Sequence, residues 1–120
     1  MPRHLWIVVL SATVTACSTP TVCTTEARAG ISITVVDSIT GAPAGRGSTI
    51  VAREGTYTDV VNNTFTTQVE GPYGLVYERV GVYTVSVQQT SYKPWLVNNV
   101  QVTYGDCHVN TTTVTARLQH

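Results

Sequence analysis

The sequence has little charge. Only 12% of its 120 residues are Asp, Glu, Lys or Arg, whereas roughly 25% is typical of soluble proteins. Seven basic and seven acidic residues balance to a net charge of zero, with no basic stripe and no acidic run. We therefore expect no nucleic acid or other polyanion as partner, because binding one requires a concentrated positive field. The length allows one domain.

The chain also lacks a convincing 3.6-residue apolar repeat with helix caps, which argues against amphipathic helices. Thr and Val replace much of the missing charge, and their β-branched side chains suit a pleated sheet. A strand is predicted over residues 30–37. The residues on its inward face are Ile31, Ile33 and Val35. This alternation is the period of a half-buried strand.

Seven further strands are predicted from the same alternation and from the turn residues between them. They cover residues 48–54, 57–61, 65–69, 75–79, 82–88, 97–104 and 107–118. Asn62 and Asn63 are predicted to form a hairpin tip, since Asn tolerates left-handed backbone. Residues 71–74 are predicted to form a turn. Eight short strands at this spacing indicate an all-β sandwich or barrel.

Two details refine this prediction. Gly41 and Gly45 are expected to supply positive φ in the turn after the first strand. In the last strand, Val109 falls on one parity and Val114, Ala116 and Leu118 fall on the other. A bulge or a strand that changes sheets would reconcile the two sets.

The N-terminus has the form of a targeting signal. A short basic start containing Arg3 precedes about a dozen apolar and small residues that end at Ala16. A membrane-spanning helix needs roughly 20 apolar residues, so this segment is too short to span and suits a signal peptide. Residues 1–16 are therefore predicted to be a signal peptide.

The end of this segment, Val14-Thr15-Ala16-Cys17, resembles the bacterial lipoprotein signal. The resemblance implies cleavage before Cys17, attachment of lipid to that cysteine, and a cell-envelope protein anchored in a membrane. Residues 17–29 would then be a tether to the domain. The alternative is ordinary cleavage near Ala16, which leaves Cys17 as a thiol on a secreted or periplasmic protein.

The chain has three cysteines. Cys23 lies just before the first predicted strand and Cys107 opens the last, and export places both in an oxidising compartment. A Cys23–Cys107 disulfide is therefore predicted, and closing a loop of this length contributes about 4 kcal/mol. Metal ligation is the rival. His108 is the only histidine near a cysteine after the signal segment, and the spacing does not offer two further zinc ligands, so no metal or cofactor is predicted.

A family resemblance rests on two stretches. Val-Asp is followed by Ser-Ile-Thr-Gly-Ala-Pro-Ala over residues 38–44. Residues 78–87, which contain a strand led by Gly81, are followed by Tyr92-Lys-Pro-Trp95. Together they resemble the carboxypeptidase regulatory-like domain over nearly all of residues 30–118. Related transthyretin-like and adhesin repeat domains share these motifs. The resemblance implies a Greek-key sandwich of seven to eight strands, prealbumin-like, found as an accessory module of exported proteins.

Catalytic groups are sparse. The seven acids are scattered over predicted loops and strand ends, His108 is expected to be an edge or packing residue, and His120 is expected to fray at the terminus. The hydroxyisourate hydrolases share a transthyretin-like fold, but that family has histidines in its early strands and a Tyr-Arg-Gly-Ser end. This chain ends Ala-Arg-Leu-Gln-His. The sequence therefore predicts no enzyme.

What remains is binding. Tyr92 and Trp95, in the loop predicted over residues 91–95, are the candidate ligand contacts, because exposed aromatics favour interfaces and sugar rings. The predicted function is a non-catalytic cell-envelope lipoprotein, a binding or scaffold module for an envelope protein or carbohydrate. The alternative is an accessory module that binds peptide or carbohydrate for a separate peptidase or glycan-uptake system.

Overall fold

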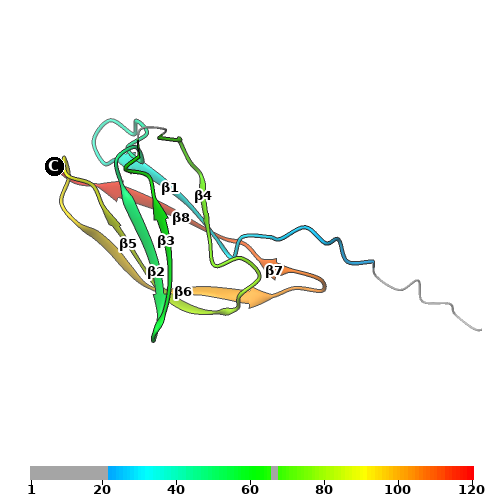
Figure 1. Cartoon of the computed structure of the whole chain (residues 1–120). Coiled ribbons are helices and arrows are strands. Elements are labelled where there is room, and N and C mark those ends of the chain that lie inside the picture. The colour runs from blue at the N-terminus through cyan, green and yellow to red at the C-terminus, as the bar shows by residue number, and fades with distance from the viewer. Residues whose placement is uncertain (1–21, 66–67) are drawn as a thin grey trace, which may run out of the picture.

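The computed structural model describes residues 22–65 and 68–120 (Figure 1). This part of the chain contains eight strands and no helix. The strands are β1 (Ile31–Asp37), β2 (Thr49–Glu54), β3 (Tyr57–Asn62), β4 (Tyr73–Leu75), β5 (Gly81–Gln88), β6 (Trp95–Tyr104), β7 (Val109–Asn110) and β8 (Thr112–Leu118). The predicted all-β class is confirmed. The predicted signal peptide, residues 1–16, and Cys17 lie outside the described residues.

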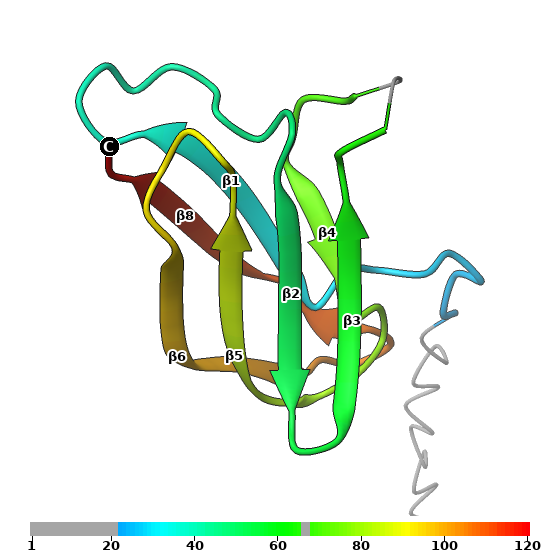
Figure 2. The same ribbon diagram turned by 60° about the vertical axis from the view of Figure 1, so that its left-hand side comes forward.

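The strands form two packed sheets, which Figure 2 shows from the side of β2 and β3. One sheet has the order β4-β1-β8, with β1 antiparallel to β4 and parallel to β8. The other has the order β3-β2-β5-β6-β7 and curls where β6 bends. The chain crosses between the sheets after β1, β3, β4 and β7, as a Greek-key sandwich requires. The predicted sandwich is therefore confirmed.

The core lies between the inward faces of the two sheets. In β1 the residues Ile31, Ile33 and Val35 are buried and alternate with half-buried neighbours, as predicted. Tyr83, Val85 and Val87 of β5 do the same from the opposite sheet. Burial of each such aliphatic side chain contributes about 1.5–3 kcal/mol, and this contribution holds the two sheets together.

The parity conflict in the last predicted strand is resolved by a change of sheet. Val109 is buried within β7, on the edge of the five-stranded sheet, whereas Ala116 and Leu118 are buried within β8 of the other sheet. Thr111 lies between the two strands, and its hydroxyl donates to the carbonyl of Ala29 at 2.7 Å. The sheet-changing alternative is thus the correct one.

A second break in parity, in β6, was not predicted. Trp95 and Val97 face inward before the break, and Val100 and Val102 are buried after it. The register slips because two residues of β6, Asn98 and Asn99, lie opposite one residue of β5. Asn99 has a φ of 59°, which Asn tolerates better than most residues. This bulge turns both apolar pairs toward the core.

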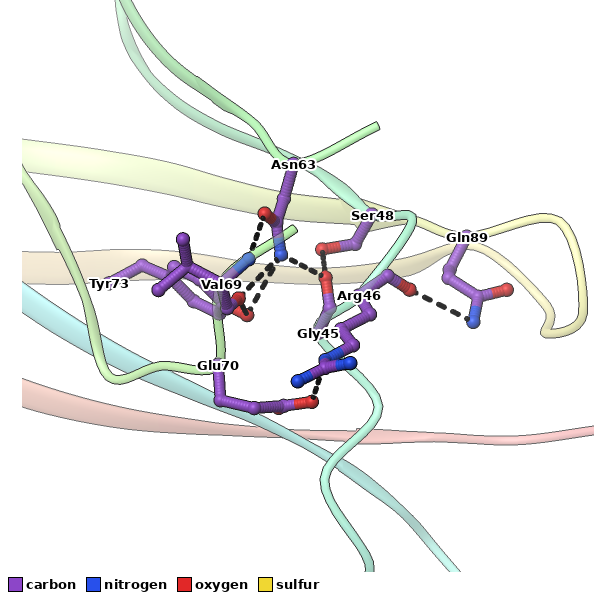
Figure 3. Close-up of polar contacts among 8 residues, drawn as sticks. All are labelled: Gly45, Arg46, Ser48, Asn63, Val69, Glu70, Tyr73 and Gln89. Atoms are coloured by element: carbon purple, nitrogen blue, oxygen red, sulfur yellow. Dashed lines mark hydrogen bonds and ion pairs between the residues drawn. The ribbon is translucent and has the colours of Figure 1, made fainter. Parts of the chain in front are cut away.

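The predicted hairpin between residues 57–61 and 65–69 is wrong. Asn63 is buried rather than exposed at a tip, and its side-chain amide donates to the carbonyls of Gly45 at 2.9 Å and Val69 at 2.8 Å. Its Oδ1 accepts from the N–H of Val69 at 2.9 Å (Figure 3). Residues 65, 68 and 69 belong to no strand. One buried amide supplies the hydrogen bonds that a paired strand would otherwise provide.

The predicted strand over residues 75–79 is also wrong. The strand is β4, Tyr73–Leu75, which pairs with β1, and residues 76–80 form a turn in which Val76 and Glu78 have positive φ. Leu75 and Val76 are both fully buried, so strand alternation ends there. Gly41 has the positive φ expected of it, but Gly45 does not. Gly45 instead leaves room for the Tyr73 ring, since a Cβ there would lie 2.2 Å from the Tyr73 hydroxyl.

Candidate functional site

The disulfide defines one end of the sandwich, which we call the near end. Cys23 and Cys107 are bonded, with their Cα atoms 5.2 Å apart and 84 positions of sequence between them, as predicted. The chain reaches this end before β1 begins and passes it again between β6 and β7. Figure 1 shows the N-terminal segment leaving from this side of the molecule. The disulfide therefore joins the N-terminal segment to the domain.

A chain of hydrogen bonds lies beside the disulfide. His108 Nδ1 is 2.5 Å from Glu78 Oε1, and His108 Nε2 is 2.9 Å from the hydroxyl oxygen of Thr24. A carboxylate only accepts, so Nδ1 carries the proton, and in the neutral imidazole Nε2 accepts from the Thr24 hydroxyl. The His108 side chain is only 11% exposed. The expected edge or packing histidine is thus a connecting residue between two distant segments.

Glu78 is the centre of this cluster. Its carboxylate also accepts from the backbone N–H groups of Arg28, at 2.8 Å, and Val109, at 3.3 Å. The bond from Arg28 is the largest cause that lowers the pKa of Glu78 below its usual range, and His108 and Val109 lower it further. The turn over residues 76–80, with its left-handed Glu78, aims the carboxylate at the N-terminal segment.

Hydroxyl, imidazole and carboxylate in this order are the groups of a nucleophilic triad. Acyl transfer also needs N–H donors aimed at the oxyanion. The neighbouring N–H groups of Arg28 and Val109 both donate to Glu78 instead. The arrangement, as it stands, attaches residues 23–28 of the predicted tether to the domain. Sequence reasoning missed it because residues 24, 78 and 108 meet only through the fold.

The opposite end of the sandwich, which we call the far end, is organised by Asp37. One oxygen, Oδ1, accepts from the backbone N–H groups of Ile39 and Thr40 at 2.8 and 2.9 Å. The other oxygen, Oδ2, accepts from the Tyr92 hydroxyl at 2.9 Å and from His120 Nε2 at 2.6 Å. The two backbone donors are the largest causes that hold the pKa of Asp37 well below its usual range. Asp37 thus closes the turn after β1.

The expectation that His120 frays is wrong. Besides its bond to Asp37, its ring lies against that of Tyr92, with ring centroids 4.7 Å apart and an interplanar angle of 37°. The hydrogen bond that the Tyr92 hydroxyl donates to Asp37 raises the pKa of Tyr92. We call Asp37, Tyr92 and His120 the Asp37 cluster. It fixes the loop between β5 and β6 against the chain terminus.

The two predicted ligand contacts lie on different hollows. Tyr92 lines a hollow of 340 Å³ at the start of β2 and the end of β5, which we call the far hollow. Its other lining residues include Gly47, Thr49, Gln88, Thr90 and Pro94. Trp95 lines a separate hollow of 320 Å³ with Lys93, Leu96 and Arg117. Pro94 lines both and separates them, so the two aromatic rings do not form one surface.

No group of three or more His, Cys, Asp or Glu side chains that could hold a metal ion is present among residues 22–65 and 68–120. No helix long and apolar enough to cross a membrane occurs in the same part of the chain.

Known proteins provide no assignment. No protein-family model matches the chain, and no curated protein matches it.

Proposed function

We propose that this protein is a non-catalytic, lipid-anchored module of a bacterial cell envelope, attached at its near end and binding a partner at its far end. The observation that carries this proposal is the separation of the two ends. The N-terminal segment is joined at the near end through the Cys23–Cys107 disulfide, whereas the far hollow lies beside the Asp37 cluster.

The length of β1 measures that separation. β1 starts at Ile31, shortly after the segment that the Cys23–Cys107 disulfide holds at the near end, and it ends at Asp37, in the Asp37 cluster. Seven residues at about 3.3 Å per step span roughly 20 Å. Only five residues separate Cys17 from Cys23. An extended chain advances at most about 3.6 Å per residue, so a lipid on Cys17 would keep the near end close to the membrane and direct the far hollow away from it.

Membership of the carboxypeptidase regulatory-like family is part of the proposal. It is supported by the turn motif over residues 38–44 and by the two-sheet architecture. Asp37, just before the motif, accepts backbone N–H groups of the turn, and Gly41 has the positive φ that the turn needs. The second candidate function follows from that resemblance: an accessory module that presents peptide or carbohydrate to a separate peptidase or glycan-uptake system. The far hollow would serve either function.

Lipid attachment is tested by feeding cells an alkyne analogue of palmitate and comparing the full chain with Cys17→Ser. We expect the label on the full chain in the membrane fraction and its loss in Cys17→Ser. The matched control Ser18→Ala, which changes the next residue to one of similar size, retains the label. Label that persists in Cys17→Ser would overturn the anchor.

A further inference from the structure

We infer that the far hollow binds a neutral carbohydrate. This inference rests on the proposed function, since it names the ligand class for the binding end. The volume of 340 Å³ lies within the range of small-molecule sites, about 300–1,000 Å³. Its position at the end of the β2–β5 ladder places it on rigid strands rather than on a loop alone, because Thr49 of β2 and Gln88 of β5 are directly paired there.

The chemistry of the lining is neutral and rich in groups that both donate and accept. None of the residues that line the hollow in the described part of the chain is charged, and most carry a hydroxyl or an amide. Within residues 22–65 and 68–120, the side chains of Thr49, Gln88 and Thr90 have no hydrogen-bond partner in the structure. Sugar hydroxyls also donate and accept, so they match these three side chains.

The hollow also has an apolar wall that is held in place. Tyr92 and Pro94 line it, and the Tyr92 ring is fixed by its hydroxyl bond to Asp37 and by the ring of His120. Gln89 is held as well: its Nε2 lies 3.5 Å from the carbonyl of Arg46 (Figure 3), and its Oε1 accepts from the N–H of Ser91 at 2.6 Å. A rigid aromatic face suits the C–H face of a sugar ring, and preorganisation reduces the ordering that binding requires.

An extended peptide suits this hollow less well. Peptides commonly bind by adding a strand to an exposed sheet edge. The strands at the hollow, β2 and β5, are interior strands of the order β3-β2-β5-β6, so their backbone groups already pair with neighbours on both sides. The neutral lining likewise offers no cation for an acidic ligand. Side-chain hydroxyls and amides are the groups left for recognition, and they favour a sugar.

The test is calorimetric titration of the 120-residue chain with three neutral probes: maltopentaose, cellopentaose and xylopentaose. A galacturonic acid pentamer and a penta-alanine peptide serve as the acidic and peptide probes. We expect binding of at least one neutral probe and of neither other probe. Gln88→Ala and Thr90→Ala should each weaken that binding roughly ten-fold, since each removes a hydrogen-bonding group.

Gln101→Ala is the matched control, because Gln101 is also an exposed amide on the outer face of the same sheet but does not line the hollow. It should leave the affinity unchanged. Binding of no neutral probe, or affinity that is the same in Gln88→Ala, Thr90→Ala and the unaltered protein, would overturn the inference. If no neutral probe binds but an envelope protein is crosslinked from position 90 in cells, the proposal of a carbohydrate ligand is wrong, whereas the proposal of a binding module is supported.

Discussion

The hydroxyl of Tyr92 donates to Oδ2 of Asp37 at 2.9 Å, across 55 positions of the sequence. This bond joins the turn that follows β1 to the loop between β5 and β6, and His120 completes the cluster from the chain terminus. The ring that lines the far hollow is therefore positioned by a carboxylate in the other sheet. The stability of the far end depends on the charge of that carboxylate.

Stability should fall in acid because of Asp37. Its pKa is lower in the folded protein than the ordinary value of about 3.9. The stabilisation is therefore present above that ordinary pKa and is lost as the pH falls toward the folded pKa. Urea unfolding measured between pH 7 and pH 2.5 should show a decline that begins near pH 4. Asp37→Asn should be less stable at pH 7 and show a shallower decline. A variant with the same acid dependence as the unaltered protein would refute this assignment.

The cluster at the near end should be structural and not catalytic. His108→Ala removes the link between Glu78 and Thr24, and we expect faster hydrogen exchange at the backbone amides of Arg28 and Val109, which donate to Glu78. Exchange is read by mass spectrometry. His120→Ala is the matched control, since it removes a histidine at the far end and should leave those two amides unchanged.

The same variant tests whether the Thr24, His108 and Glu78 arrangement acts as a triad. Hydrolysis of p-nitrophenyl acetate should be equal in the unaltered protein, Thr24→Ala and His108→Ala, and equal to the background rate of the buffer. Hydrolysis above background that disappears in both variants would show a working nucleophile and would contradict the non-catalytic proposal.

The disulfide should contribute substantially to stability. It closes a loop of 84 positions, and the chain-entropy model assigns about 4 kcal/mol to a loop of this length. The double variant Cys23→Ser, Cys107→Ser should lose about that free energy of unfolding in urea. Alkylation of the folded protein without reductant should label neither cysteine. Modification of Cys23 or Cys107 under those conditions would show that the pair is not formed.

Asn63 should matter far more than its neighbour in the sequence. Asn63→Ala removes the acceptor of the Val69 N–H and one of the donors to each of the carbonyls of Gly45 and Val69. Each such hydrogen bond contributes about 0.5–1.5 kcal/mol. We expect a loss of about 3 kcal/mol in the free energy of unfolding. Asn62→Ala, at an exposed position, should change it by less than about 0.5 kcal/mol. Equal losses in the two variants would mean that the buried amide is not what holds this loop.

Much of the fold could be predicted from alternation alone. β1 and β5 lie within one residue of the bounds expected of them, and β1 buries the residues predicted to face inward, because the side chains of both strands alternate without interruption. The parity conflict between Val109 and Ala116 was also visible in the sequence; it allowed a bulge or a change of sheet, and the structure has the change of sheet after β7. Alternation and a break in its parity both lie within short stretches of sequence, so they can be recognised without knowledge of the tertiary fold.

The errors have a common physical cause. A buried Asn63 that hydrogen-bonds to backbone looks the same in the sequence as an Asn in an exposed turn, so a hairpin was expected where a side chain supports a loop. Strand β4 is only three residues long, which is too short for its alternation of buried and half-buried residues to be recognised in the sequence. The link from Glu78 to His108 and the stacking of His120 on Tyr92 join residues that only the tertiary fold brings together.

The most direct test of an anchored domain that binds at its far end is photo-crosslinking in intact cells. A benzophenone amino acid is placed at position 90, in the far hollow, or at position 101, on the exposed outer face of β6. The account predicts an adduct to an envelope protein or glycan from position 90, and none from position 101. Adducts that are absent at position 90, or equal at the two positions, would contradict it.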